Sequence, residues 1–168
     1  MKKTCGNSLT AITVAMCAAL YSVGSLATAY IPSPWGFGQF RPAVIVPAFF
    51  AVIFGPIPAG VGAALGTLIA DSVKHGYIYP GSIIAAVPGN FLGFYLFGYM
   101  LKKHFTWGRF ILTSHITLTL ANLVVACLYV TFYKIFYLGQ LVDLTVSSLV
   151  LLVLGLTIWW FVTMLPFV

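Results

Sequence analysis

Acidic residues are almost absent from this chain. Its 168 residues contain two aspartates, Asp71 and Asp143, and no glutamate, and charged residues of both signs make up only 6% of the sequence. Soluble domains carry roughly 25% charged residues, whereas 61% of this chain is hydrophobic. So few charges cannot keep a soluble surface hydrated. We therefore expect most of the surface to face lipid, as in a multi-pass protein of the cell membrane.

The shortage of reactive groups argues against an enzyme. Two separated carboxylates cannot provide paired acid–base catalysis. The three histidines, His75, His104 and His115, have no second ligand at helical spacing, so no metal site is expected. No phosphate-binding loop of the G-x-x-x-x-G-K-[ST] type occurs, so we expect no cofactor in this chain. The eight Lys and Arg residues are scattered, which argues against nucleic acid and indicates contact with membrane lipid.

Long uncharged stretches set the number of expected spans, because a membrane-crossing helix needs about 20 apolar residues. We predict an all-α bundle of six transmembrane helices in a single membrane domain, residues 1–168. The predicted helices cover 9–29, 42–54, 58–73, 82–101, 110–134 and 144–165. Sheets are excluded because an open strand edge is not tolerated in hydrocarbon.

Residues 42–73 are ambiguous, because Gly55-Pro56-Ile57-Pro58 either separates two short helices or kinks one long helix. With six helices, five basic residues lie on the side of the N-terminus and three on the other. With five helices the split is four to four. Cytoplasmic loops are enriched in Lys and Arg. The charge bias therefore favours six helices, with both termini in the cytoplasm.

Small residues recur at helical spacing in three of the predicted helices. Ala11, Ala15 and Ala19 form a smooth strip on the first helix, on which another helix of this chain or a separate subunit could pack. The third and fourth helices carry G-x-x-x-G patterns, at Gly62 and Gly66 and at Gly89 and Gly93. For these glycines we predict packing within the chain.

A binding site is indicated by aromatic and amide residues in three segments. The loop 30–42 is rich in proline, glycine and aromatic residues, and it could cover a flat organic ligand. The fifth helix carries a polar stripe of His115, Thr119, Asn122, Tyr129 and Tyr133 on one face. The candidate ligand-binding residues are Trp35, Phe37, Gln39, Arg41, Asn90, Asn122 and Tyr129.

Simpler roles remain open for these residues. The aromatic side chains could form only an interfacial belt, and the polar groups could serve only helix packing. Arg41 could anchor its helix at the membrane surface. Because Arg41 is the cation beside the aromatic loop, we also expect the ligand to carry a carboxylate or phosphate rather than a positive charge.

These features together resemble the substrate-binding subunits (S components) of energy-coupling factor (ECF) transporters. The most specific part of the resemblance is residues 36–71, with Arg41-Pro42, Phe54-Gly55-Pro56 and the small residues that follow. The resemblance implies a six-helix subunit that captures a vitamin or related micronutrient at the outer face. It also implies docking of Ala11, Ala15 and Ala19 on a transmembrane coupling subunit, which works with two cytoplasmic ATPases. ATP would then be used by the partner subunits.

Two other functions compete with uptake of a micronutrient. The chain could be a self-sufficient channel or facilitator for small molecules, or a membrane assembly protein that transports nothing. The alanine strip favours a transport subunit with a partner over a self-sufficient channel. Nothing in the sequence identifies the vitamin.

Overall fold

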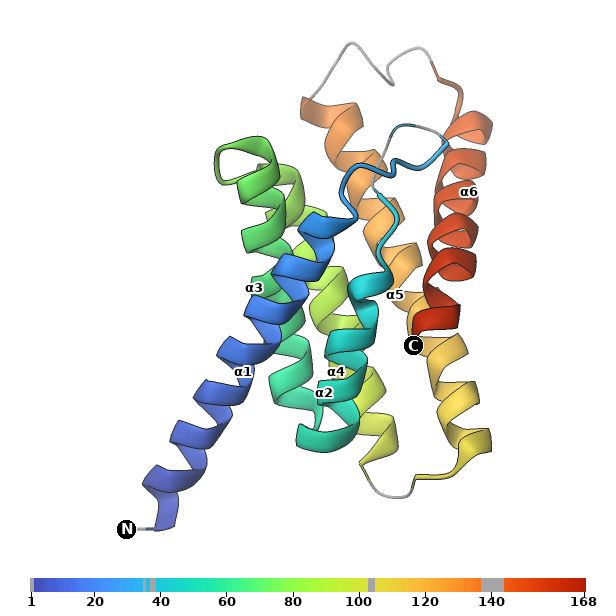
Figure 1. The fold of residues 1–168 in the computed structure, drawn as a ribbon. Coiled ribbons are helices and arrows are strands. Elements are labelled where there is room, and N and C mark those ends of the chain that lie inside the picture. Colours follow the sequence, from blue (N-terminus) through green and yellow to red (C-terminus); the bar gives the residue numbers. More distant parts are fainter. Residues whose placement is uncertain (1, 35, 37–38, 103–104, 137–143) are drawn as a thin grey trace.

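The computed structural model consists of helices and connecting segments, and it describes residues 2–34, 36, 39–102, 105–136 and 144–168, with side chains from residue 8 onward. Six α-helices follow one another along the chain (Figure 1). They are α1 (Lys2–Ala27), α2 (Ile45–Phe54), α3 (Pro56–His75), α4 (Val87–Leu101), α5 (Trp107–Phe136) and α6 (Val146–Met164). Short helical turns precede α2 and α4 and follow α6: η1 (Pro42–Val44), η2 (Ser82–Ala86) and η3 (Leu165–Phe167).

The six predicted helices are confirmed, and the ambiguous region consists of two helices. Five helical segments are long and apolar enough to cross a membrane, whereas Pro42–Phe54 is shorter. At 1.5 Å per residue this short segment spans roughly 20 Å, less than the hydrocarbon core of about 30 Å. Gly55 separates it from α3 because its φ of 91° lies in a region that favours glycine.

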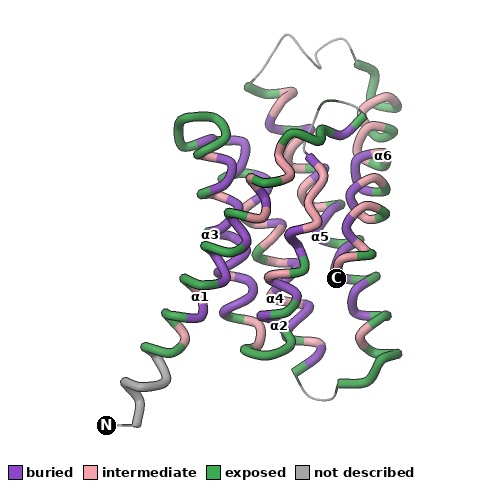
Figure 2. The backbone as a smooth tube through the Cα atoms, viewed as in Figure 1, coloured by how far each residue is buried: buried purple, intermediate pink, exposed green. Residues whose placement is uncertain are grey.

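The predicted internal packing of the glycines is also confirmed. A Cβ atom on Gly62 would lie 2.6 Å from Cys17 Cβ, and one on Gly66 would lie 2.8 Å from the Ala18 carbonyl oxygen. These two glycines therefore allow α1 and α3 to pack closely. Gly89 and Gly93 have the same effect between α4 and α5. Buried residues accordingly line the inner faces of the helices, and exposed ones mark the outside (Figure 2).

The start of α4 is irregular because of a proline. Pro88 has no N–H to donate to the preceding turn, and the chain accommodates it with the π-helical turn η2 immediately before α4. Within this turn the Val87 N–H donates to the carbonyl of Ser82, five residues earlier. Wide turns of this kind are frequent at functional sites. Here the turn places Ser82 beside Asp71 of α3.

The bundle has two distinct ends (Figure 1). One carries residues 28–34 and 39–41, the end of α3, the end of α5 and the start of α6, and thus Arg41, Lys74 and Lys134. The opposite end carries the start of α1, the end of α4 and the start of α5, with Lys102 and Arg109. The α6 helix and the chain end before the lower end of α5 (Figure 1).

Candidate functional site

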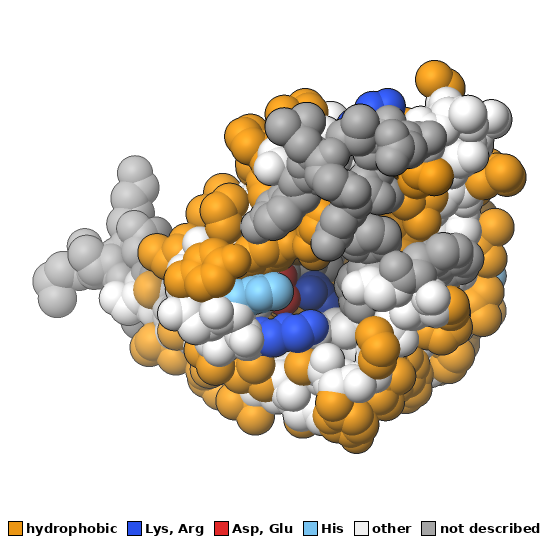
Figure 3. All heavy atoms as spheres, turned by 90° about the horizontal axis from the view of Figure 1, so that it is seen from above, with side chains coloured by type: hydrophobic (Ala, Val, Ile, Leu, Met, Phe, Trp, Pro, Cys, Tyr) orange, Lys and Arg blue, Asp and Glu red, His pale blue; other side chains and the backbone are white. Residues whose placement is uncertain are grey.

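A cavity lies at the first of these two ends, lined by residues of α3, α4, α5 and α6 and by Pro32, Gly36, Gln39 and Arg41. It has a volume of about 160 Å³, enough for on the order of ten water molecules. Acidic, basic and histidine side chains gather in a hollow on this face (Figure 3). The lining is polar on the side of α3 and the segment 32–41, and aromatic on the side of α5; it includes Gln39, Arg41, Asp71, Lys74, His75, Tyr79, Asn90, Asn122, Tyr129, Tyr133 and Trp160.

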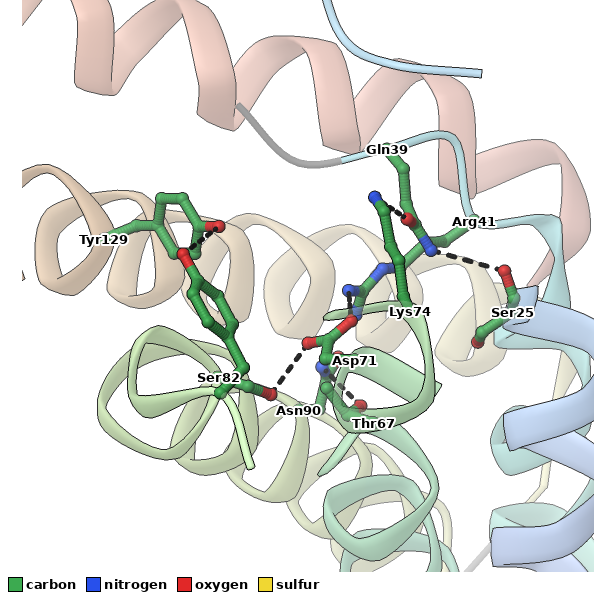
Figure 4. A network of polar contacts seen from close by, with 10 residues as sticks. Ser25, Gln39, Arg41, Thr67, Asp71, Lys74, Ser82, Asn90 and Tyr129 are labelled. Carbon is green, nitrogen blue, oxygen red and sulfur yellow. Dashed lines mark hydrogen bonds and ion pairs between the residues drawn. The ribbon is translucent and has the colours of Figure 1, made fainter. Parts of the chain in front are cut away.

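An ion pair connects the segment 32–41 to α3. Arg41 Nη2 donates to Asp71 Oδ1 at 3.0 Å, and the two side chains are 12% and 10% exposed. The hydroxyl of Ser82 donates to the other carboxylate oxygen of Asp71 at 2.7 Å (Figure 4). Burial by itself would lower the pKa of the Arg41 guanidinium, but the Asp71 carboxylate outweighs burial and holds this pKa above its ordinary value. Arg41 therefore stays charged, with its counter-ion inside the protein.

Gln39 makes a second connection between the same elements. Its Nε2 donates to the backbone carbonyl oxygen of Ser25 in α1 at 3.3 Å, and its Oε1 accepts from Lys74 Nζ at 2.8 Å. The Gln39 side chain is buried, at 3% exposure. Together with the ion pair, these contacts hold the segment 39–41 against both α1 and α3 (Figure 4).

Two carboxamides contribute to the wall on α4 and α5. Asn90 Nδ2 donates to Thr67 Oγ1 at 2.9 Å. Asn122 is 5% exposed, and its Nδ2 has no hydrogen-bond partner in the part of the chain that the structure describes. A buried unpaired amide costs about 1–3 kcal/mol. Because the terminal torsion of asparagine is soft, a small rotation lets this amide bond a molecule in the cavity.

Tyrosine hydroxyls connect α5 to the segment between α3 and η2. Tyr79 lies in the segment between α3 and η2, and its hydroxyl is 2.7 Å from that of Tyr133 and 3.3 Å from that of Tyr129. The ring of His75 stacks on the ring of Tyr79, with centroids 4.1 Å apart and planes at 18°. These rings provide flat apolar surface beside polar groups. Such a lining suits a flat heterocycle with hydrogen-bonding substituents.

The structure brings most of the predicted ligand-binding residues together. Gln39, Arg41, Asn90, Asn122 and Tyr129 all line this one cavity. Trp35 and Phe37 lie outside the described residues. That any of them contacts a ligand stays a prediction.

One expectation about the polar residues needs correction. His115 and Thr119 share the polar stripe of α5, but both are exposed, and His115 Nδ1 lies 2.8 Å from the Ile111 carbonyl oxygen. They lie outside the cavity because their side chains are on the exposed side of α5, where the His115 ring contacts Phe161 of α6 with ring centroids 5.6 Å apart. Arg41 is paired with Asp71, and the expectation of an anionic ligand stays a prediction.

Sequence reasoning missed several residues that line the cavity or bond to its lining, as Ser82 does to Asp71. Asp71, Lys74, Tyr79 and Ser82 were not among the candidates, although each has a hydrogen bond in the network. Asp71 could have been found, because it is one of only two acidic residues and ionisable groups within membrane proteins tend to be functional.

The alanine strip of α1 lies away from the cavity. Ala11, Ala15 and Ala19 are exposed, and the opposite face, with Cys17 and Tyr21, packs inside the bundle. In the described part of the chain, no helix covers these alanines. Packing within the chain is therefore excluded for this strip, and docking of a separate subunit stays a prediction.

A comparison with protein families decides the assignment. The family model described as "ECF-type riboflavin transporter, S component" matches residues 7–164. The chain belongs to this family. The resemblance seen in the sequence is thereby confirmed, and the chain is a membrane-embedded S component, a transport subunit rather than an enzyme. No curated protein and no solved structure matches the chain.

Proposed function

We propose that this S component captures riboflavin, or a closely similar flavin, from the outer side of the membrane. Riboflavin is the substrate that the family description prints. The observation that carries the proposal for this chain is the cavity, which combines aromatic rings with the unpartnered amide of Asn122. The flavin ring system is flat and carries an imide edge, where an N–H lies between two carbonyl groups.

The polar groups of the cavity match such an edge. The Nδ2 of Asn122 can donate to a ring carbonyl, and Asn90, whose Nδ2 is engaged by Thr67, can accept a ring N–H at its Oδ1. Riboflavin has no net charge. An uncharged ligand agrees with a cavity in which Arg41 is already paired with Asp71.

The distribution of basic residues supports an opening toward the outside. The ends of the bundle differ in Lys and Arg content, with Lys102, Arg109 and the start of α1 at the end opposite to the cavity. Because Lys and Arg are enriched on the cytoplasmic side, we assign this end, and the N-terminus with it, to the cytoplasm.

Delivery into the cell requires partners. We assign docking on a transmembrane coupling subunit to Ala11, Ala15 and Ala19, because an exposed strip of small residues allows a second helix to approach closely. Two cytoplasmic ATPases bound to the coupling subunit would supply the energy. This division of roles agrees with the missing phosphate-binding loop in this sequence.

Binding of the vitamin can be tested directly with the purified protein. Riboflavin fluorescence is expected to be quenched in a saturable one-to-one titration, and mass spectrometry of released small molecules should find a flavin. Thiamine, a cationic vitamin, serves as the control and should not compete. A chain that leaves riboflavin fluorescence unchanged and releases a different compound would show that the assigned substrate is wrong.

Docking can be tested separately by co-purification with the coupling subunit and ATPases. Ala15→Trp is expected to abolish assembly and uptake while riboflavin binding is retained, because the indole keeps the helices apart. Leu151→Trp provides the control on an exposed position of α6 and should assemble normally. Normal assembly of the Ala15 variant would remove the docking role.

A further inference from the structure

We propose that the groove between α5 and α6 binds one phospholipid with an anionic headgroup. The groove opens toward the outside of the bundle and has a volume of about 460 Å³, larger than the cavity described above. Leu123, Val130 and Ile135 of α5 and Val150, Val153 and Leu154 of α6 form its apolar surface. This inference does not depend on which vitamin the protein carries.

The polar residues of the groove do not interrupt its apolar surface. The Thr131 hydroxyl donates to the Cys127 carbonyl oxygen of the same helix at 2.7 Å, so this hydroxyl bonds to the backbone of its own helix. Val150 and Ile135 are 52% and 58% exposed. Apolar side chains exposed along a concave surface are best covered by a flexible hydrocarbon chain, because it can follow the irregular shape.

The dimensions of the groove match one leaflet of a bilayer. From Leu123 to Ile135 the groove follows α5 for twelve residues, roughly 18 Å at 1.5 Å per residue. Half of the hydrocarbon core measures about 15 Å. An acyl chain of the leaflet on the cavity side would therefore extend along most of the groove.

Charge determines the kind of headgroup. Lys134 lines the groove and is the basic residue in the last turn of α5, at the end of the bundle where headgroups of this leaflet lie. A lysine at this depth extends its ammonium group toward the membrane surface. It would attract the phosphate of an anionic lipid more strongly than that of a zwitterionic lipid.

A protein helix is a poorer occupant of this groove. Helices associate in membranes through Gly, Ala and Ser, which permit close approach, and α1 presents such residues on the other side of the bundle (Figure 1). The groove is instead lined by branched aliphatic side chains. Its opposite side on α5 carries Asn122, Tyr129 and Tyr133, so a bound lipid would lie directly behind the wall of the cavity.

Native mass spectrometry of the purified chain tests the proposal, with phosphatidylglycerol and phosphatidylcholine of identical acyl chains as probes. We expect one bound lipid and about fivefold tighter retention of phosphatidylglycerol, the effect of one lysine near a headgroup. Lys134→Gln should remove this preference. Val150→Trp, which fills the groove, should weaken both lipids, and Leu151→Trp on the neighbouring face of α6 should weaken neither.

Two results would overturn the proposal: equal retention of the two lipids by the unmodified chain, or equal effects of the Val150 and Leu151 variants. A dimer mass in place of a lipid adduct would assign the groove to a second copy and also refute it. If one of the variants does not fold, the unmodified chain still provides a test. Phosphatidylglycerol should raise the unfolding temperature of the unmodified chain saturably, more than phosphatidylcholine does, and equal shifts would contradict the lipid site.

Discussion

Separating Arg41 from Asp71 should destabilise the whole bundle. Both side chains are nearly buried, at 12% and 10% exposure, so Asp71→Asn leaves the guanidinium without its counter-ion. Removing one partner of a buried ion pair costs about 3–5 kcal/mol. For a chain of this size, each kcal/mol lowers the unfolding temperature by roughly 2–4 °C. We therefore expect a decrease of roughly 10 °C for Asp71→Asn and a similar one for Arg41→Gln.

The double variant Arg41→Gln/Asp71→Asn tests the reasoning. Two neutral amides can bond to each other, and neither leaves a buried charge, so the double variant should be more stable than the sum of the single effects. Contacting residues typically show a coupling of about 0.5–3 kcal/mol. The assay is thermal unfolding in one detergent, followed by tryptophan fluorescence, with Lys102→Gln as an exposed control expected to change stability by less than about 0.5 kcal/mol.

Additive effects would refute this account. If the two single substitutions lower stability independently, to within about 0.5 kcal/mol, the ion pair contributes no coupling. Single variants as stable as the Lys102 control would show that Arg41 serves another purpose. That outcome, together with weaker binding of an anionic vitamin, would support the expectation of an anionic ligand beside Arg41.

Two further substitutions separate binding from packing. Asn122→Leu should lower flavin affinity about 5- to 150-fold, the effect of losing 1–3 kcal/mol. The thermal stability of this variant should hold or rise, because an unpaired buried amide is removed. Unchanged affinity in the fluorescence titration would contradict the binding role of Asn122. Gly62→Ala should lower stability by about 1–3 kcal/mol through overpacking against Cys17. Gly108→Ala is the control and should not lower stability, because there is open space around the new Cβ. Equal unfolding temperatures for these two variants would disprove the close contact at Gly62.

The helices could be predicted from the sequence because the residues that end each helix lie at its own boundaries. Charged residues mark the ends of apolar stretches, and Gly55 interrupts the region 42–73 by its own backbone conformation. The close contact at Gly62 could also be predicted, because the spacing of the glycines indicates close packing even when the packing partner is not known. Counting η1 and η2 with the helices that they precede, the predicted helices agree with the structure to within about three residues, except that α1 begins at Lys2 instead of residue 9.

The site depended on information that is not local. Arg41 and Asp71 are thirty residues apart in sequence, and nothing in either segment indicates that they meet. Periodicity correctly placed Asn122 and Tyr129 on one face of α5. It could not show how α6 packs against α5, and so it did not predict that His115 and Thr119 of the same stripe are exposed. A helical face is fixed by the sequence of the helix, but its surroundings depend on neighbouring helices.

The bonds around the cavity differ in strength from one side to the other. On the side of α3, the segment 39–41 is held by an ion pair and by a lysine–amide bond. On the side of α5, neutral tyrosine hydroxyls make the contacts. Bonds to charged groups contribute about 1.5–3 kcal/mol, and neutral ones about 0.5–1.5 kcal/mol. A ligand entering or leaving would therefore break the hydroxyl contacts of Tyr79 with α5 first, while the segment 39–41 moves together with α3.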